Sequence, residues 1–314
     1  MENQTTVTEF ILMGLSSDPK LQVFLFLVFL VIYLITLMGN MLIMLVIRAD
    51  PHLHTPMYFF LSNLSFVDLC YSSVTVPKML VNFLSEQKTI SIDSCLIQMF
   101  FFLASGTTEI FMLSAMAYDR YEAICHPLNY IQNMSKWVCI QLACGAWTIG
   151  FTVAVVNTFL VLRVHFCKLN KINHFCCEIP PVLHISCSDT LANEVVVLTS
   201  SVIVGLGSSS VIIVSYILII ATILRIRSTE RRHKAFSTCA SHLTVVLLFY
   251  VTAFFKYLRP TSGSSFEKLV TVQYSILTPM LNPIIYSLKN KEVKTALRKV
   301  LGKALCFPST MVPK

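Results

Sequence analysis

Charged residues are scarce in this sequence. They make up 13% of its 314 residues, whereas hydrophobic residues make up 55%. Such a chain, folded as a soluble protein, would have too little charged surface to stay in solution. The composition therefore argues against an ordinary soluble domain and suits a chain whose solvent is mostly lipid. A formal net charge of +8 would suggest nucleic-acid binding in a soluble protein, but here the basic residues are concentrated in particular connecting segments.

The first residues also lack the pattern expected of a cleavable signal peptide. The first twenty residues are polar and mildly acidic, with Glu2, Glu9 and Asp18, and no basic stretch precedes the first apolar run. That run is too long for the hydrophobic region of a signal peptide. We expect it to act as an uncleaved signal anchor.

Seven apolar segments are long enough to cross a membrane, which requires about 20 residues each. They are residues 21–47, 57–80, 96–116, 140–162, 195–223, 236–258 and 269–288. We therefore expect an all-α membrane protein, a seven-transmembrane helix bundle in one domain over residues 1–314. The expected parts are an extracellular tail at 1–22, the bundle at 23–288 and a cytoplasmic tail at 289–314.

Basic residues predict the orientation of the bundle. They cluster between the fifth and sixth spans and again after the seventh, whereas the loop between the fourth and fifth spans is balanced in charge. Because loops rich in Lys and Arg stay in the cytoplasm, the N-terminus is expected outside and the C-terminus inside. Residues 290–305 form an amphipathic pattern, typical of a helix lying in the membrane interface. Cys306 just beyond it is a candidate for palmitoylation, with an unmodified thiol as the alternative.

Cysteines gather in the long outer loop at 163–194 and at the start of the third span. They are Cys95, Cys167, Cys176, Cys177 and Cys187. Thiols that face the secretory lumen tend to oxidise, so disulfides are expected. Zinc is the alternative, because His174 and His184 lie among these cysteines, but no Cys-x-x-Cys pair supports it. The sequon at Asn3 predicts a glycan on the outer tail.

Two carboxylates lie deep in the predicted spans, Asp68 in the second and Glu109 in the third. Ionisable groups inside a membrane are rare and mark functional sites. Each carboxyl is either kept neutral by burial or binds a shared cation, for which sodium with help from Asn282 is the favoured interpretation.

Several motifs occur in an order and spacing that fit the seven spans. Residues 116–130 read MAYDRYEAICHPLNY, 56–71 read PMYFFLSNLSFVDLCY, 234–243 read KAFSTCASHL and 279–290 read PMLNPIIYSLKN. Gly39-Asn40 and Ser215-Tyr216 add two shorter matches. Over nearly its whole length the chain thus resembles the olfactory receptors of the tetrapod (class II) type, a branch of the rhodopsin-like G-protein-coupled receptors.

The resemblance implies an activation switch near the cytoplasmic side. Arg120 would leave Asp119 on activation and engage the G protein, which in this family is the olfactory stimulatory type that raises cyclic AMP. The residues implied in the switch are Asp119, Arg120, Tyr121, Tyr216, His242, Asn282, Pro283 and Tyr286. A proline inside the seventh span removes a backbone hydrogen bond and provides a hinge.

The resemblance also pairs Cys95 with Cys177 and Cys167 with Cys187. Cys176 stands where the family usually has an aromatic residue, so it either competes for pairing or remains a luminal thiol. Glu122 stands where the family usually has valine. It is expected either to hold Arg120 in the inactive state, lowering basal signalling, or to weaken the contact with the G protein.

The implied ligand site lies between the outer halves of spans three, five, six and seven. Its residues are Met99, Phe102, Leu103, Gly106, Thr107, Ser200, Ser201, Val204, Tyr250, Ala253, Phe254, Tyr257, Val272 and Ser275. As a set they describe an apolar cavity with a few hydroxyl groups, although ordinary helix packing explains any single one equally well. No acidic residue lies in the outer half of span three, and Lys256 and Arg259 can reach water. A small, uncharged, hydrophobic odorant is therefore expected.

Other functions fit the sequence less well. A transporter would show internal repeats, and an enzyme would show a nucleophile with its base or a metal motif; the sequence shows neither. We expect no enzymatic activity and no cofactor apart from the sodium ion. The main alternative is a rhodopsin-like receptor for a lipid or a peptide, because the switch motifs report signalling and say little about the ligand. Membrane lipids and a heterotrimeric G protein are the expected partners.

Overall fold

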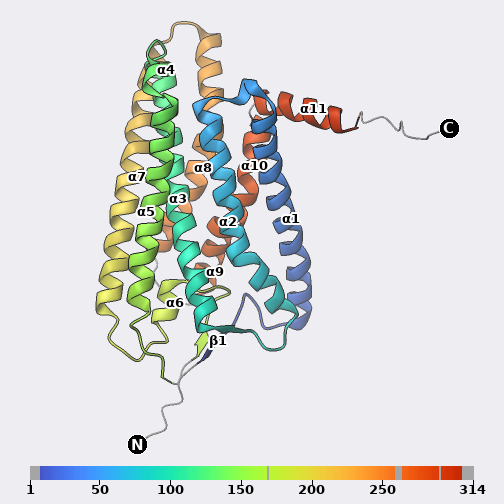
Figure 1. The fold of residues 1–314 in the computed structure, drawn as a ribbon, viewed down its shortest axis with the longest axis vertical. Helices are drawn as coiled ribbons and strands as arrows, with labels where there is room; N and C mark the ends of the chain where they lie inside the picture. Colours follow the sequence, from blue (N-terminus) through green and yellow to red (C-terminus); the bar gives the residue numbers. More distant parts are fainter. Residues whose placement is uncertain (1–7, 168–169, 259–263, 290, 306–314) are drawn as a thin grey trace, which may run out of the picture.

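The computed structural model describes residues 8–167, 170–258, 264–289 and 291–305, and within these ranges the chain is a bundle of long helices (Figure 1). The long helices are α1 (Pro19–Ala49), α2 (Pro56–Leu84), α3 (Ile92–Cys125), α5 (Lys136–Val161), α7 (Leu191–Arg225) and α8 (Thr229–Leu258). The last pass consists of α9 (Ser265–Val272), the π-helical turn η2 (Gln273–Leu277) and α10 (Thr278–Lys289). Shorter helices are η1 (Pro51–Leu53), α4 (Tyr130–Asn133), α6 (Ile179–Leu183) and α11 (Lys291–Leu305).

Five of these helices are long and apolar enough to cross a membrane, namely α1, α2, α3, α5 and α7. Helix α8 contains a shorter apolar stretch, His242–Thr252. The last pass is divided by its π-helical turn, which the sequence analysis did not predict; such turns often lie at functional sites.

Several helices continue beyond the apolar segments that hydropathy delimits. Helix α3 continues to Cys125 instead of ending near residue 116, so Asp119 and Arg120 lie inside it. The basic segment after the fifth span is mostly helical, because α7 ends at Arg225 and α8 begins at Thr229. Polar residues extend a helix beyond its apolar part as readily as they form a loop.

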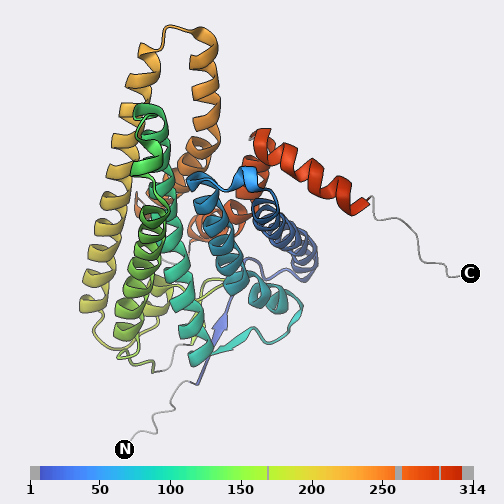
Figure 2. The ribbon, with the colours of Figure 1, turned by 45° about the horizontal axis from the view of Figure 1, so that its top comes forward.

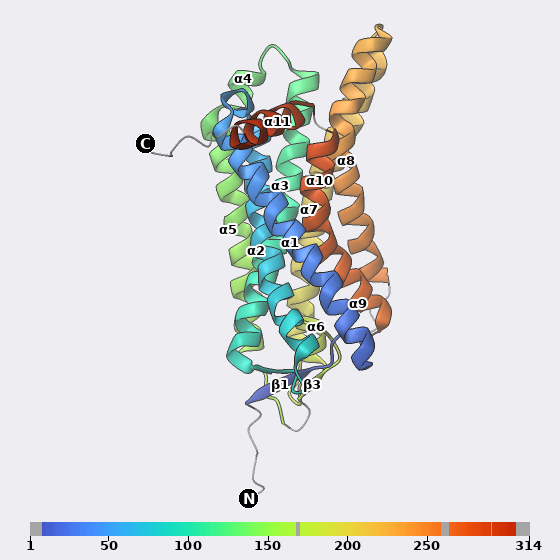
Figure 3. The same cartoon turned by 90° about the vertical axis from the view of Figure 1, so that its right-hand side faces the viewer.

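The outer tail contains structure that was not predicted. Strand β1 (Glu9–Leu12) pairs antiparallel with β2 (Thr89–Ser91) and parallel with β3 (Lys171–Ile172), giving the order β2-β1-β3. Helix α1 then begins at Pro19, where the Asp18 side chain caps the Lys20 amide at 3.0 Å. The sheet and α6 lie at the end of the bundle nearest the N-terminus, whereas α4 and α11 lie at the opposite end (Figures 1 and 3).

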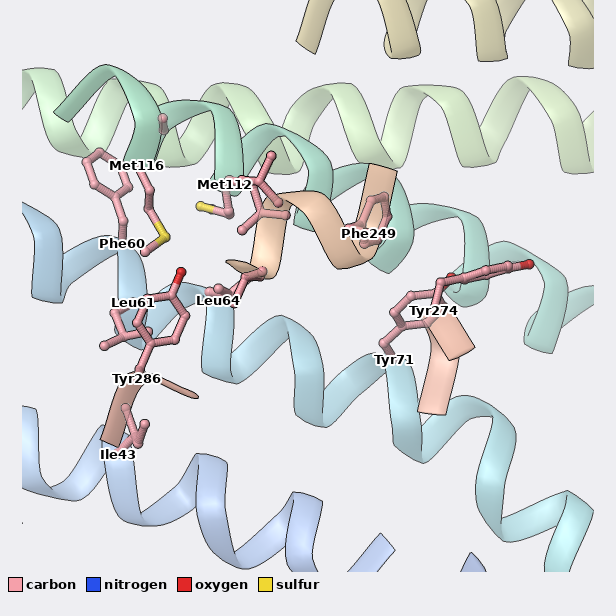
Figure 4. Packing of buried hydrophobic residues seen from close by; sticks show 14 of the residues in the cluster. Ile43, Phe60, Leu61, Leu64, Tyr71, Met112, Met116, Phe249, Tyr274 and Tyr286 are labelled. Carbon is pink, nitrogen blue, oxygen red and sulfur yellow. The ribbon is translucent and has the colours of Figure 1, made fainter. Parts of the chain in front are cut away.

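Two apolar clusters hold the bundle together. The larger one runs along its interior; Tyr286 lies near Ile43 and Leu61 at one end of this cluster, and Tyr71 lies beside Tyr274 at the other (Figure 4). The smaller cluster lies under the sheet and joins Phe10 and Leu12 of β1 to the start of α3 and the outer loop.

Helix α11 turns away from the bundle (Figure 2). Tyr58 donates a hydrogen bond of 2.6 Å to Glu292, and Val293 and Ala296 are buried. The apolar face predicted for this segment thus packs partly against α1 and α10. The predicted sites at Asn3 and Cys306 lie outside the described residues, as does Arg259.

Candidate functional site

Arg120 is held by its neighbour Asp119 near the end of α3. Its Nε donates to Asp119 Oδ2 at 3.0 Å, and Nη2 reaches the same oxygen. The other carboxylate oxygen accepts a bond of 2.7 Å from the Tyr130 hydroxyl of α4. Burial, followed by the charge of Asp119, raises the pKa of Tyr130, which keeps the phenol protonated as a donor. Asp119 is fully buried, so these bonds supply the partners its carboxylate needs.

Glu122 does not take part in that arrangement. Its Oε2 accepts a hydrogen bond of 2.8 Å from the Asn133 amide and lies 3.5 Å from His126 Nδ1. The expectation that Glu122 holds Arg120 is therefore corrected. Helix α3 makes 3.6 residues per turn, which turns side chains two positions apart to different sides. Tyr121 lies beside His126, with ring centroids 5.2 Å apart.

Tyr216 of α7 and His242 of α8 meet in the interior, at 2.7 Å between the hydroxyl and Nδ1. His242 Nε2 lies 3.0 Å from the carbonyl oxygen of Leu113. Because a carbonyl only accepts, Nε2 carries the proton, and Tyr216 donates to Nδ1 of the neutral ring. One contact set thus joins α3, α7 and α8.

A polar group lies in the middle of the bundle. Asn282 Nδ2 donates to both oxygens of Asp68, at 3.2 and 2.9 Å, and both residues are buried. Glu109 is fully buried on α3, and neither of its oxygens has a hydrogen-bond partner among the described residues; the same is true of Asn282 Oδ1. Buried oxygens without donors are costly unless a proton or a cation satisfies them. The two carboxylate oxygens of Glu109 and Oδ1 of Asn282 are the kind of ligand atoms that a hard cation prefers.

Close packing between α1 and α10 fixes the proline hinge. Asn40 Nδ2 donates a bond of 3.0 Å to the Pro279 carbonyl. A side-chain carbon on Gly39 would lie 3.0 Å from Pro283 Cγ, so glycine allows this approach. Tyr286 of the same pass is fully buried.

The predicted ligand residues on α3 divide into two groups. Met99 and Leu103 pack in the small cluster beneath the outer loop. Phe102 instead packs on Tyr71 and Tyr274, with ring centroids 5.0 and 6.0 Å apart, and Gly106 faces the Tyr71 hydroxyl. Thr107 is buried.

The remaining predicted ligand residues mostly have partners within the bundle. The Tyr250 hydroxyl donates a hydrogen bond of 2.7 Å to Ser208, and the Ser275 hydroxyl donates one of 2.6 Å to the Thr271 carbonyl. The Ser200 hydroxyl lies 3.4 Å from Asn157 Nδ2. Val204 and Val272 are buried, and Ser201 is half-buried. The side chains of Ala253, Phe254, Lys256 and Tyr257 lie outside the described residues.

A small hollow among the described residues lies near Gly14 and the C-terminal part of α2, and none of the predicted ligand residues lines it. It is lined by Gly14, Ser16, Met79, Asn82, Phe83, Lys88 and Phe175.

The outer loop is tied down by two disulfides, Cys95–Cys177 and Cys167–Cys187, which are the pairs that the resemblance implies. Cys176 belongs to neither and is fully buried. Tyr274 donates a bond of 2.8 Å to Glu178 of this loop, which joins the loop to the π-helical turn.

Sequence reasoning missed several of these partners, above all Tyr71, Tyr274 and Glu178. Two of them are uncharged residues inside spans, where hydropathy gives no sign of a role. Tyr130 and Asn133 were also missed, although Tyr130 ends the motif at 116–130.

Similarity to known proteins extends over most of the chain. The sequence profile of the olfactory receptor family matches residues 29–304. Olfactory receptor 5B12 of Homo sapiens is 52% identical over 306 residues, which cover 97% of this chain and 98% of that protein. Olfactory receptor 5M5 of Mus musculus is 52% identical over 306 residues, covering 96% and 95%. Olfactory receptor 8S1 of Homo sapiens is 52% identical over 292 residues, covering 93% and 81%.

Proposed function

Because the chain belongs to the olfactory receptor family of G-protein-coupled receptors, we propose that it detects a small, uncharged, hydrophobic odorant and activates a stimulatory G protein of the olfactory type. Family membership makes it a multi-pass membrane receptor and not an enzyme. The observation that carries the signalling proposal is the Asp119–Arg120 pair with Tyr130, because the buried Asp119 carboxylate holds the partly exposed Arg120 near the end of α3, ready to be released.

The proposed topology has seven spans. Helix α8 and the divided last pass supply the sixth and seventh, in addition to the five long apolar helices. An odd number of spans places the termini on opposite sides, in keeping with the positions of β1 and α11 at opposite ends of the bundle (Figures 1 and 3). The basic residues near α8 and α11 favour the cytoplasm for that end, and α11 would lie in the membrane interface.

The proposed ligand site is the predicted set between spans three, five, six and seven. The described members of this set combine apolar side chains with hydroxyl groups, such as those of Tyr250 and Ser275. Glu109 lies further along α3, one helical turn after Ser105 and towards the inner end of the helix. No acidic residue of α3 lies between Asp93 and Glu109, so a cationic amine would find no counter-ion there. Shape and one or two hydrogen bonds would select the odorant.

A sodium ion is proposed to bind among Asp68, Glu109 and Asn282. The support is chemical: Asn282 is hydrogen-bonded to Asp68, Glu109 is buried on the neighbouring helix α3, and the Glu109 oxygens have no donor in the described part of the chain. A cation would offset the repulsion between two carboxylates in a medium of low dielectric constant.

A cyclic AMP reporter assay tests the function directly. Cells that express the receptor and the olfactory stimulatory G protein are exposed to a chemically diverse odorant panel. At least one neutral odorant should give a saturable response that disappears in Arg120→Ala at equal surface expression. Responses only to lipids, peptides or charged agonists, or a response that survives in Arg120→Ala, would overturn the proposal.

A further inference from the structure

We propose that His174, Cys176 and Glu178 form a zinc-binding site on the inner side of the outer loop. These residues are alternate positions of one short segment between β3 and α6. Their side chains are buried, with 0%, 0% and 3% of their surface exposed. The nitrogen, sulfur and oxygen that each can offer lie within 4.8 Å of one another.

The distances suit a shared metal ion. His174 Nδ1 lies 3.4 Å from Cys176 Sγ, and this sulfur lies 4.0 Å from Glu178 Oε1. Zinc–sulfur and zinc–nitrogen bonds of normal length at a tetrahedral angle place the two ligand atoms about 3.6 Å apart. The nitrogen–sulfur distance of 3.4 Å is close to this value, and the sulfur–oxygen distance of 4.0 Å is somewhat longer. The Cys176 amide also points to Nδ1 at 3.4 Å, a contact that metal binding would replace.

The types of ligand favour zinc. Thiolate, imidazole and carboxylate are the side chains that bind zinc, whereas a carboxylate is a poor ligand for Cu(I) and a thiolate is a poor one for calcium or magnesium. The Cys176 thiol releases its proton on binding, and the resulting thiolate and the Glu178 carboxylate together offset the two positive charges of the ion. Three protein ligands leave the fourth position for water or another small ligand.

Neither disulfide uses any of the three proposed zinc ligands. Sequence reasoning set zinc against disulfides because it grouped Cys177 and His184 with the other ligands. In the structure Cys177 is bonded to Cys95, and His184 is exposed. Glu178 takes the third place, so both features can exist in the same loop.

A hydrogen bond from the last pass already orients the Glu178 carboxylate. The Tyr274 hydroxyl donates 2.8 Å to Glu178 Oε1, as groups behind a metal ligand commonly do. Tyr274 belongs to the π-helical turn and packs near Phe102 and Tyr71. An ion in the loop would therefore act on the last pass.

Zinc binding is measured on the purified full-length receptor in lipid nanodiscs, after removal of metals with a chelator. Zinc is titrated in competition with a chromogenic chelator, and Co²⁺ is added separately to detect the absorption band of a thiolate–cobalt bond. We expect one tight zinc per receptor and a thiolate–cobalt band. Both should be lost in Cys176→Ser and Cys176→Phe, and His174→Gln should bind at least tenfold more weakly.

Two matched variants control for general effects, His184→Gln on the exposed loop and Cys144→Ser on the exposed face of α5; both should bind like the wild type. Tyr274→Phe, a positioning variant, should weaken zinc binding by about 10- to 100-fold while keeping the cobalt band. Cys176→Phe restores the aromatic residue usual in the family, so its folding can be checked by surface expression.

Zinc bound equally well by Cys176→Ser, or no zinc above the level of a receptor lacking both His174 and Cys176, would refute the site. Any effect of zinc on signalling rests on the proposed function, but the binding measurement does not. A receptor that binds zinc yet answers no odorant would refute only the proposed function.

Discussion

The Asn133 side-chain amide donates a hydrogen bond of 2.8 Å to Glu122, which connects the short helix α4 to α3. The Tyr130–Asp119 bond makes a second connection between the same two helices. Glu122 thus contacts α4, which also bonds the partner of Arg120, but it does not contact Arg120 itself.

Replacing Glu122 by valine should raise basal cyclic AMP. The variant removes the Asn133–Glu122 hydrogen bond between α4 and α3. A bond of this kind contributes about 1 kcal/mol, which corresponds to roughly a fivefold change in a two-state equilibrium. Reporter cells without odorant measure the effect at matched surface expression. Asn133→Ala should act in the same direction, and the double variant should add little to either. Unchanged or lower basal activity in Glu122→Val would contradict this role.

Tyr130→Phe should raise basal activity and lower the thermal midpoint of the purified receptor, because Asp119 is buried and would lose a donor. The raised pKa of Tyr130 also predicts how the bond depends on pH. A folded-state pKa above the unfolded value gives stability that is present at low pH and is lost only as pH rises beyond the ordinary tyrosine range near 10.

The difference in thermal midpoint between wild type and Tyr130→Phe should therefore stay constant from about pH 6 to 9. A difference that shrinks within this range would show that another titrating group controls the contact. Phe59→Leu changes a half-buried residue of α2, a different helix, and serves as a control for general loss of packing.

Hydropathy predicted the helices well but not the contacts between them. The apolar runs of α1, α5 and α7 were found within a few residues of their ends, because a span must be apolar wherever it faces lipid. Strand β1 was missed, since it is four residues long and pairs with residues far away in the chain. The π-helical turn was missed because hydropathy does not distinguish a π-helical turn from the α-helix on either side of it.

The candidate sites show the same division. Asp68 and Glu109 were predictable, since a carboxyl in a span stands out in the sequence. The direction in which Glu122 points was not, because it depends on the rotation of α3 and on the position of α4. The surroundings of Cys176 were likewise not predictable from the sequence. In the structure His174 and Glu178, and not Cys177, form a cluster with it.

Gly39→Ala should destabilise the receptor, whereas Gly205→Ala should not. The new methyl group at residue 39 would lie 3.0 Å from Pro283 Cγ, so α10 must shift, and overpacking of this kind costs about 1–3 kcal/mol. At residue 205 nothing lies within 4 Å, and alanine in a helix gains about 0.5–1 kcal/mol over glycine. Thermal midpoints and surface expression of the two variants should move in opposite directions. Equal effects would show that α1 and α10 are not packed as closely as the structure indicates.

Sodium should stabilise the wild-type receptor but not Glu109→Gln. If the ion binds among Asp68, Glu109 and Asn282, a sodium concentration ten times its dissociation constant adds about 1.4 kcal/mol to the free energy of unfolding. Thermal midpoints are compared in sodium chloride and in choline chloride at equal ionic strength, so that screening is the same in both. Glu109→Gln keeps the size of the side chain and removes its charge, which should abolish the difference between the salts. Glu86→Gln, an exposed acid outside the bundle interior, should retain it. If the wild type is equally stable in both salts, the two carboxyls are kept neutral by protons and no cation is needed between them.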